Sequence, residues 1–278
     1  MKDIQPFYIP GATQWKMESK RGAIYRIMAW IPEGEAPPDG FPIYYVLDAN
    51  AVFGTFTETM RVQSKGPRRQ EPAIIVGIGY DSEAPIVTER RFLDFTLPAA
   101  DHEMPPPKNN KAWPANGGVE VFLDFIEQEL KPSIEKMTKV NQQRQALFGH
   151  SLGGFLVLYT LCTRPKLFQY YAAGSPSVWW KNSVIFEYAK RFIAKEAQYS
   201  TSAKRLFVGV GSEEREHMVN GGEQIYQMFA SDQSTVRAKF SCFEGENHIS
   251  VLLPFISQVI RDFRDQASDQ PKTSSFLL

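Results

Sequence analysis

The sequence has few of the features that mark disulfide-stapled, polyanion-binding or membrane-spanning proteins. Only two cysteines, Cys162 and Cys242, occur among its 278 residues, whereas small secreted scaffolds carry several disulfides in shorter chains. Both cysteines flank apolar residues, so we expect buried free thiols. The formal net charge is zero, with 31 basic and 31 acidic residues. Because nucleic acids and anionic membranes are bound by clustered Lys and Arg, neither partner is expected.

Long apolar runs are also missing. The sequence has no apolar stretch of the roughly 18 residues that a membrane-spanning helix needs, and its start, MKDIQPFYIPG, lacks the apolar segment of a secretory signal. We therefore expect a cytoplasmic protein. The 43% of apolar residues is enough for a sizeable core. Because repeats and low-complexity linkers are absent, residues 1–278 are expected to form one domain that frays from about residue 266.

The sequence does contain an alternation of strand-like and helix-like segments. The expected strands are 12–19, 22–31, 41–48, 72–79, 143–149, 167–175, 204–214 and 236–245. The expected helices are 119–137, 151–165, 182–197, 220–231 and 250–265. Lys20–Gly22 separates the first two strands, which favours an antiparallel hairpin there. The pattern predicts an α/β fold with a mostly parallel sheet, an antiparallel N-terminal edge and helices on both faces.

One segment does not fit the alternation. Residues 80–118 include LPAADHEMPPPKNNKAWPANGG and are too long and irregular for an ordinary connection. We expect this segment to form a lid-like loop.

The chemistry centres on Gly149-His150-Ser151-Leu152-Gly153, which fits the pattern G-x-S-x-G. The pattern describes a tight turn from a strand into a helix, in which glycines leave room for a serine in a strained backbone conformation. It follows an expected strand and begins an expected helix, as the motif requires. We therefore predict that Ser151 is a nucleophile at the carboxyl end of the sheet.

A serine hydroxyl needs a base, and the chain has 4 histidines. His248 follows the last expected strand, which is where the base belongs in this arrangement. His102 lies in the lid-like loop. His150 is inside the turn and is expected to point away from the nucleophile. His217 follows the candidate acids and is expected to be structural or to face the substrate.

The acid that orients His248 should follow the strand at 204–214. Glu213, Glu214 and Glu216 compete for this role, and Asp232 is a weaker candidate because it ends a helix. We favour Glu214, which stands where the strand emerges into a loop. A Ser–His pair without a carboxylate remains an alternative.

An oxyanion needs backbone N–H donors. The amide of Leu152 follows directly from the turn. A second donor should come just after the strand at 41–48, at Ala49 or Asn50, and we favour Asn50. The alternative is that Asp48–Asn50 serves only as a turn.

Longer motifs carry a resemblance that covers nearly the whole chain. They are YYVLDANAVF, ERRFLDFT, GGVEVFLDFIEQELKP, FGHSLGGFLVLYTLCTRPKLFQYYAAGSPSVWW, VGSEEREHM and FEGENHIS. With these motifs the chain resembles the putative-esterase group of the α/β-hydrolase fold, which includes enterobactin, salmochelin and bacillibactin esterases. The resemblance implies ester hydrolysis by Ser151 and His248, with Glu214 at the acid position. It implies no metal or other cofactor of the protein's own.

The resemblance also concerns substrate binding. Arg91, in RFLDFT, matches an arginine that the group places near the substrate, and its alternative is an ion pair with Asp94. The group often has Asp-Gly where this chain has Asp48-Ala49. Trp179 and Trp180 follow the strand at 167–175 and are candidates to contact catecholate rings, although a tryptophan there could equally close the core.

The expected function is hydrolysis of a small-molecule carboxylic ester through an acyl-enzyme. The implied substrate is a catecholate siderophore trilactone, free or iron-loaded, in which iron would belong to the substrate. Two alternatives stay open. One is a short-chain carboxylesterase or a thioester hydrolase of the S-formylglutathione type. The other is a catalytically silent protein that uses this fold for binding.

Overall fold

The structure is a computed structural model that describes residues 4–65, 71–106, 112–199 and 204–264. Its strands are β1 (Ala12–Glu18), β2 (Ile24–Trp30), β3 (Phe41–Val46), β4 (Ile74–Gly79), β5 (Val140–His150), β6 (Tyr170–Gly174), β7 (Arg205–Gly211) and β8 (Arg237–Phe243). Its helices are α1 (Ala49–Gln63), α2 (Thr88–Phe95), α3 (Val119–Phe125), α4 (Lys131–Met137), α5 (Leu152–Thr163), α6 (Trp180–Ser183), α7 (Ile185–Tyr199), α8 (Glu216–Phe229) and α9 (Leu252–Arg264). A π-helical turn, η3 (Ile126–Leu130), joins α3 to α4, and a 3₁₀ turn, η1 (Asp101–Glu103), follows α2.

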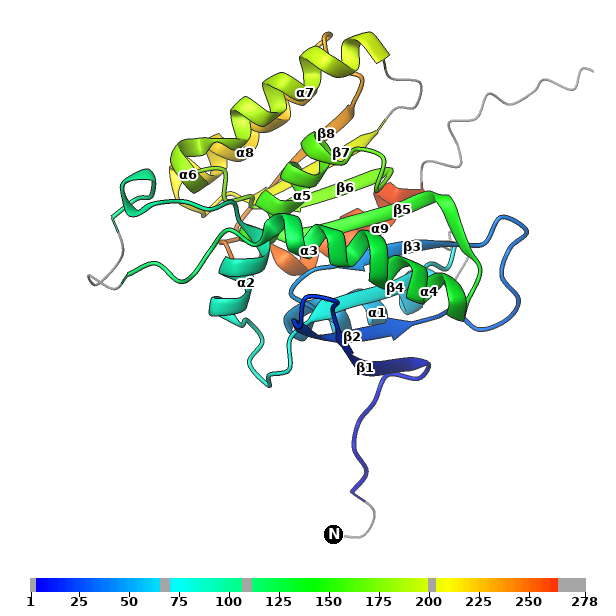
Figure 1. The fold of residues 1–278 in the computed structure, drawn as a ribbon. Coiled ribbons are helices and arrows are strands. Elements are labelled where there is room, and N and C mark those ends of the chain that lie inside the picture. Colours follow the sequence, from blue (N-terminus) through cyan, green and yellow to red (C-terminus); the bar gives the residue numbers. More distant parts are fainter. Residues whose placement is uncertain (1–3, 66–70, 107–111, 200–203, 265–278) are drawn as a thin grey trace, which may run out of the picture.

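The strands form one 8-stranded sheet in the order β1-β2-β4-β3-β5-β6-β7-β8 (Figure 1). β2 pairs antiparallel with both β1 and β4, and the remaining pairs are parallel. The β1–β2 hairpin closes with a hydrogen bond from the Gly22 amide to the Ser19 carbonyl, and Gly22 has a φ of 81° that favours glycine. The expected parallel sheet with an antiparallel edge is confirmed.

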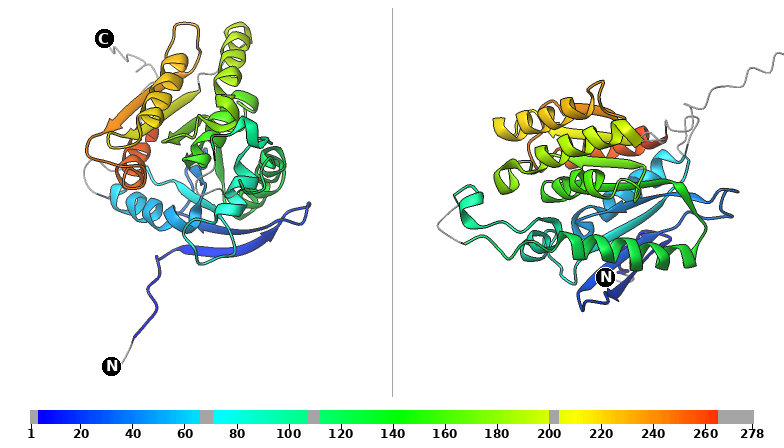
Figure 2. Two further views of the ribbon diagram at one scale, coloured as in Figure 1. Left: turned by 90° about the vertical axis from the view of Figure 1, so that its left-hand side faces the viewer. Right: turned by 45° about the horizontal axis from the view of Figure 1, so that its top comes forward.

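Helices cover both faces of the sheet, as Figure 2 shows. α1 and α9 pack on one face, and α3, α4, α5, α7 and α8 pack on the other. The side chains of β3 contribute to the hydrophobic core on both faces of the sheet. Ile43 and Tyr45 belong to the core under α3–α8, while Tyr44 and Val46 belong to the core under α1 and α9. Successive side chains of a strand point to opposite faces, so a strand buried on both faces is apolar throughout.

Two helices lie where the sequence did not predict them. α1 contains several β-branched and aromatic residues with low helix propensity. It forms because a helix puts Val52, Phe53, Phe56 and Met60 on one buried stripe. α2 lacks an apolar stripe, since two of its three buried residues are charged. Its partners lie elsewhere in the chain, and local sequence does not reveal them.

Residues 80–118 are therefore less irregular than expected. The segment contains α2 and η1, and its remaining described part is extended or turn-like. Residues 107–111, within the expected lid-like loop, lie outside the described residues, as does the expected fraying from residue 266.

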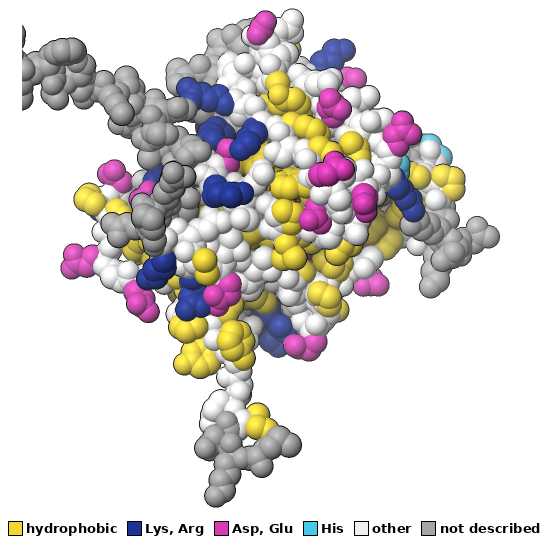
Figure 3. Space-filling view, turned by 180° about the vertical axis from the view of Figure 1, so that it is seen from behind, with side chains coloured by type: hydrophobic (Ala, Val, Ile, Leu, Met, Phe, Trp, Pro, Cys, Tyr) yellow, Lys and Arg dark blue, Asp and Glu magenta, His cyan; other side chains and the backbone are white. Residues whose placement is uncertain are grey.

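The cysteines differ from the expectation in one respect. Both are free, and Cys162 on α5 is largely covered, but Cys242 is exposed. β8 is an edge strand, since no other strand among the described residues pairs with its outer side. Side chains of both charges are spread over the face seen in Figure 3, in keeping with the balanced composition. No helix among the described residues is long and apolar enough to cross a membrane.

Candidate active site

The turn between β5 and α5 holds Ser151 in a strained conformation. Its φ of 58° and ψ of −115° are unusual for any residue with a side chain. The surrounding glycines permit the turn. A Cβ on Gly149 would lie 2.3 Å from the carbonyl oxygen of Gly153, and one on Gly154 would lie 2.8 Å from that of Gly174. The local sequence thus folds into the sharp strand-to-helix turn that the pattern G-x-S-x-G predicts, with Ser151 at the end of a strand.

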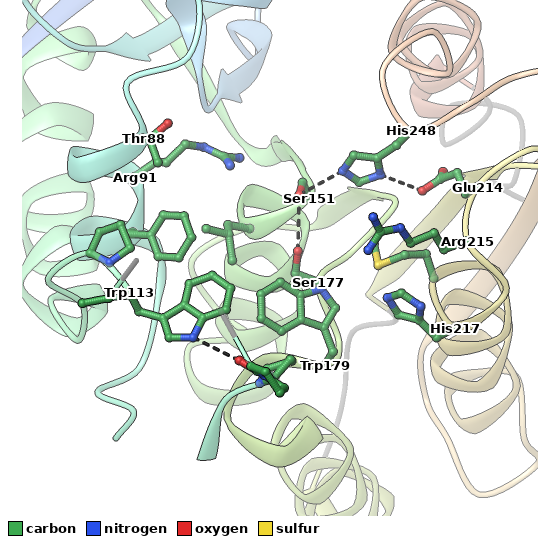
Figure 4. Close-up of a pocket in the computed structure, with 17 residues that line it drawn as sticks. Thr88, Arg91, Trp113, Ser151, Ser177, Trp179, Glu214, Arg215, His217 and His248 are labelled. Carbon is green, nitrogen blue, oxygen red and sulfur yellow. Dashed lines mark hydrogen bonds and ion pairs between the residues drawn. The ribbon is translucent and has the colours of Figure 1, made fainter. Parts of the chain in front are cut away.

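Ser151, His248 and Glu214 form a continuous chain of hydrogen bonds (Figure 4). Ser151 Oγ lies 3.1 Å from His248 Nε2, and His248 Nδ1 lies 2.6 Å from Glu214 Oε2. With a proton on Nδ1 donated to the carboxylate, Nε2 is left as the acceptor for the serine hydroxyl. Residues 97 positions apart in the chain therefore meet at one edge of the sheet.

A close contact between two loops brings the acid to the histidine. A Cβ on Gly211, at the end of β7, would lie 2.2 Å from the carbonyl oxygen of Glu246. That carbonyl accepts a hydrogen bond from the Glu213 amide at 2.9 Å. Glycine at position 211 thus allows the loop that carries His248 to cross directly over the loop that carries Glu214.

Glu214 is fixed by three donors. Besides His248, the Ser175 hydroxyl donates to Oε1 at 2.5 Å and the Gly211 amide donates to the same oxygen at 2.8 Å. Burial alone would raise the pKa of Glu214, but these hydrogen bonds outweigh it and lower the pKa below its ordinary value of 4.5. The carboxylate therefore stays ionised opposite the histidine. By contrast, Glu216 accepts from Asn220 on its own helix.

Ser175 was not identified from the sequence. It is completely buried and has a φ of 39° although it is not glycine. Its position directly after β6, in the motif GSPS, is the signal that could have identified it, because Ser151 and Glu214 follow the neighbouring strands β5 and β7. A strained, buried residue that bonds a functional carboxylate indicates that the surrounding fold imposes its conformation.

His150 lies closer to the site than expected. Its ring centroid is 4.6 Å from that of His248. Burial, followed by the nearby His248 and Arg91, lowers the pKa of His150 to about 3. His150 is therefore neutral at physiological pH and packs beside the base as an uncharged ring.

The two expected oxyanion donors have different surroundings. Leu152 is the first residue of α5, where backbone N–H groups have no partner within the helix, and it borders the pocket. Asn50 does not line the pocket. Its side chain bridges to the segment just after β4, accepting from the Tyr80 amide and donating to the carbonyls of Tyr80 and Ser82. These side-chain bonds anchor α1. The backbone amide of Asn50 stays the predicted second donor, with the amide of Ala49 as its alternative.

Arg91 forms a buried ion pair, and its partner is Asp48 rather than Asp94. Its Nε and Nη2 donate to the two carboxylate oxygens of Asp48 at 3.0 and 2.9 Å. Arg90, the neighbouring residue, makes the ion pair with Asp94 at 3.3 Å. Arg91 still borders the pocket, as expected of a residue near the substrate.

A pocket with a volume of about 890 Å³ opens in front of Ser151 (Figure 4). Ser151, Leu152, Ser177, Glu214 and His248 line its catalytic side. The other lining residues come from α2, the segment after it, the start of α6 and the start of α8: Thr88, Arg91, Phe92, Pro105, Pro106, Ala112, Trp113, Pro114, Trp179, Arg215, His217 and Met218. His217 thus faces the pocket, while His102 and Met104 do not line it.

Of the two expected tryptophans, only Trp179 borders the pocket. Trp180 is fully buried, and its indole donates to the Leu97 carbonyl at 3.0 Å. Trp180 therefore closes the core, which is the alternative that the sequence left open for this pair. The next residue, Lys181, donates to the Pro98 carbonyl at 2.6 Å. Trp180 and Lys181 thus connect the segment after α2 to α6.

Phe92, Trp113 and Trp179 form an aromatic wall on the pocket. Trp113 lies 5.7 Å from Phe92 and 5.9 Å from Trp179 between ring centroids. The Trp113 indole donates to the Pro105 carbonyl at 3.2 Å, which holds the ring in place. Trp113 belongs to the expected lid-like loop, and Phe92 was not identified from the sequence. Among the described residues, no group of three or more His, Cys, Asp or Glu side chains is placed to hold a metal ion.

Known proteins resemble this chain over most of its length. Ferri-bacillibactin esterase BesA of Bacillus subtilis is 40% identical and covers 92% of this chain and 90% of its own. The siderophore triacetylfusarinine C esterase of Aspergillus fumigatus is 35% identical over 93% of this chain and 94% of its own. Among solved structures, the BES protein from Bacillus cereus has a TM-score of 0.88 and 39% identity, covering 94% of this chain and 99% of its own.

A second solved structure, siderophore hydrolase EstA from Aspergillus nidulans, has a TM-score of 0.82 and 29% identity, covering 96% of this chain and 98% of its own. A family model described as putative esterase matches residues 21–251. That match spans both the Ser151 turn and the loop that carries His248. From this match and from relatives so similar over nearly the whole chain, we conclude that the chain belongs to the putative esterase family.

Proposed function

We propose that the protein hydrolyses carboxylic esters of siderophores, with Ser151 as nucleophile, His248 as general base and Glu214 as the acid that orients the base. The observation that carries the proposal is the chain of hydrogen bonds from Ser151 Oγ through His248 to Glu214, of 3.1 and 2.6 Å, at the side of a large pocket. A serine, a base and an orienting acid in this geometry are the requirements for acyl transfer.

The proposed reaction has two halves. His248 Nε2 takes the proton from Ser151 as Oγ attacks the ester carbonyl carbon, and the Leu152 amide stabilises the oxyanion. The bond to the leaving oxygen then breaks, and His248 returns the proton to that alkoxide. A water molecule, deprotonated by His248, then attacks the acyl carbon. The bond from that carbon to Oγ breaks, His248 returns the proton to Ser151, and the carboxylic acid product leaves. Glu214 stays ionised and stabilises the imidazolium that forms in each half.

The proposed substrate is a catecholate siderophore trilactone. Relatives from both bacteria and fungi are named as siderophore esterases. The pocket volume of about 890 Å³ is near the upper end of the usual range for ligand sites, which suits a bulky ester. The aromatic wall offers faces against which catechol rings can stack.

The charges around the pocket also suit this class of substrate. Arg91 is neutralised by Asp48, and Glu214 is engaged with His248. Arg215 is exposed, and among the described residues no carboxylate forms an ion pair with it. In Figure 4, Arg215 and His217 lie across the pocket from Trp113. A ligand with aromatic rings and negative charge, such as an iron-loaded catecholate, matches both sides.

A Ser151→Ala variant tests the nucleophile. We expect kcat for a trilactone to fall by about 10⁴-fold or more, as in other enzymes that lose this group. A fluorophosphonate probe should label the unaltered protein and not the variant. Ser231→Ala is the matched control, since Ser231 is exposed at the end of α8 and lies outside the pocket. Wild-type activity in Ser151→Ala would overturn the proposal.

A substrate comparison tests the ester class. We expect kcat/KM to be higher for iron-free or iron-loaded catecholate trilactones than for S-formylglutathione or p-nitrophenyl acetate. A preference for S-formylglutathione would instead identify a thioester hydrolase. A folded protein that neither labels with the probe nor turns over any of these compounds would be a binding protein.

A further inference from the structure

Arg91 connects three parts of the chain that surround the nucleophile. Arg91 lies on α2. Its guanidinium donates to the carboxylate of Asp48 in the turn after β3, and Nη2 also donates to the backbone carbonyl of His150 at 3.2 Å. Both side chains are buried, with exposures of 9% for Arg91 and 6% for Asp48. A planar guanidinium that makes two parallel bonds to a carboxylate fixes orientation as well as distance.

Asp48 needs such a restraint. Its φ of 52° and ψ of 40° put a residue other than glycine in the left-handed region. It directly precedes Ala49, whose amide is an alternative donor for the oxyanion. A Cβ added to Gly153 would lie 3.6 Å from Asp48 Oδ2, so the turn after β3 packs against the first residues of α5. The angle of the Asp48 turn therefore sets the position of the following amide relative to Ser151.

We propose that Arg91 is a positioning residue that acts through Asp48 and the His150 carbonyl. It holds the turn after β3 in register with the turn that carries Ser151, instead of serving mainly as a ligand for the substrate. The resemblance to known esterases implied contact with substrate, but Nε and Nη2 of Arg91 are both engaged with the protein. This role rests on the proposed function, because it concerns the geometry around the nucleophile.

The test compares Arg91→Lys, Asp48→Asn and the double variant by steady-state kinetics. Lysine keeps the charge but cannot make the paired bonds, and asparagine keeps the shape but loses the charge. If Arg91 acts through Asp48, each single variant lowers kcat by about 10- to 100-fold with little change in KM, because small displacements of reacting groups are costly. The double variant should then be no worse than the more damaged single variant.

Arg90→Lys is the matched control. Arg90 is the adjacent residue of the same helix, pairs with Asp94 and does not line the pocket. We expect its kcat to stay within about twofold of the unaltered protein, as for partly exposed ion pairs in general. Thermal unfolding of every variant shows whether the fold survives. If Arg91→Lys does not fold, Asp48→Asn alone still tests the kcat effect, since asparagine can accept one of the bonds.

Three outcomes would overturn the positioning role. They are a rise in KM at unchanged kcat in Arg91→Lys, losses that multiply in the double variant, and normal kcat in a folded Asp48→Asn. These results differ from failure of the proposed function, which would show as activity retained in Ser151→Ala. Loss of activity in Ser151→Ala together with a pure KM effect in Arg91→Lys would leave the esterase proposal standing and identify Arg91 as a substrate ligand.

Discussion

The two sides of the pocket are built in different ways. On the catalytic side, Ser151, Glu214 and His248 each come from a segment just after a strand, and hydrogen bonds fix their positions. On the opposite side, the aromatic wall comes from α2, the segment after it and the residue before α6, and its rings meet at 5.7 to 5.9 Å without directional bonds between them. Directional bonds fix reacting atoms, whereas ring contacts can adapt to a ligand.

This difference predicts a division of labour. Substitutions on the catalytic side should lower kcat, because they disturb interactions that matter in the transition state. Substitutions in the aromatic wall should raise KM, because the wall binds substrate and transition state alike. The following variants test that division, from the largest expected effect to the smallest.

Glu214→Gln should have the largest effect. A carboxamide can donate to His248 Nδ1 and so favours the wrong tautomer, for which losses of about 10⁴-fold in kcat are known. We expect KM to change little. Glu213→Gln is the matched control, because Glu213 is exposed while the Glu214 side chain is fully buried. A Glu214→Gln variant with kcat within tenfold of the unaltered protein would show that the Ser–His pair suffices.

Ser175→Ala should have a smaller effect on the same side. Removing its hydrogen bond from a carboxylate should lower kcat by about 10-fold and raise the pKa of Glu214. The lowered pKa of Glu214 in the folded protein means that its ionised form stabilises the fold above the ordinary value of 4.5. That stability is lost as the pH falls from the ordinary value through the folded-state pKa. In Ser175→Ala, where the folded-state pKa is higher, the loss should be smaller and should be complete at a higher pH.

The measurements for Ser175 are kcat against pH and unfolding free energy against pH. Ser175→Gly separates strain from bonding, since glycine accepts the φ of 39° but also lacks the hydroxyl. Both variants should show the same shift in the acidic part of the two pH profiles. The glycine variant should have the larger free energy of unfolding. If the unaltered protein and both variants have the same pH profiles at acidic pH, Ser175 contributes packing but no hydrogen bond that affects Glu214.

Trp113→Ala tests the aromatic wall. Loss of one stacking surface should raise KM for an aromatic trilactone by about 10-fold, in line with the burial of one large apolar side chain, with kcat nearly preserved. For p-nitrophenyl acetate the effect should be smaller. Trp15→Ala, on β1 and outside the pocket, is the control. A fall in kcat at constant KM would contradict the division between the two sides.

Arg215→Gln should have the smallest effect. Because Arg215 is exposed, its attraction for an anionic substrate is screened, and we expect kcat/KM for an iron-loaded catecholate to fall by about two- to fivefold at low salt. The loss should be smaller for the iron-free ester, whose phenolic groups are largely protonated near neutral pH. Arg215→Lys, which keeps the charge, should keep most of the preference for the iron-loaded over the iron-free ester. An equal loss of kcat/KM with both esters would indicate that Arg215 contributes to the shape of the pocket and not to its charge.

Most of the fold was predictable because its strands and most of its helices carry their own patterns. The apolar runs of β3 and β4 and the apolar spacing of α3 are local signals. α2 was not predictable, since its buried face consists of Arg91, Asp94 and Phe95. Charged residues there indicate a helix only when their partners, such as Asp48, are known.

The candidate site divides in the same way. Ser151, His248 and Glu214 follow strands in a fixed order along the chain, so topology pointed to each of them. Asn50 was assigned by the same reasoning, and its backbone amide stays a predicted donor. Its side chain bonds the segment just after β4, which local sequence did not indicate. Trp180 was assigned from its place after a strand. It is the residue next to Trp179, but its side chain points into the core and not into the pocket.

By itself, the sequence determined the order of the strands along the chain, the serine turn and the kinds of side chain available for catalysis, because each depends on residues close together in the chain. Only the tertiary structure decided which acid meets His248, which tryptophan faces the pocket and where Arg91 finds its carboxylate. Those outcomes depend on contacts between segments far apart in sequence, where a rotation of one residue or a close approach at one glycine changes the partner.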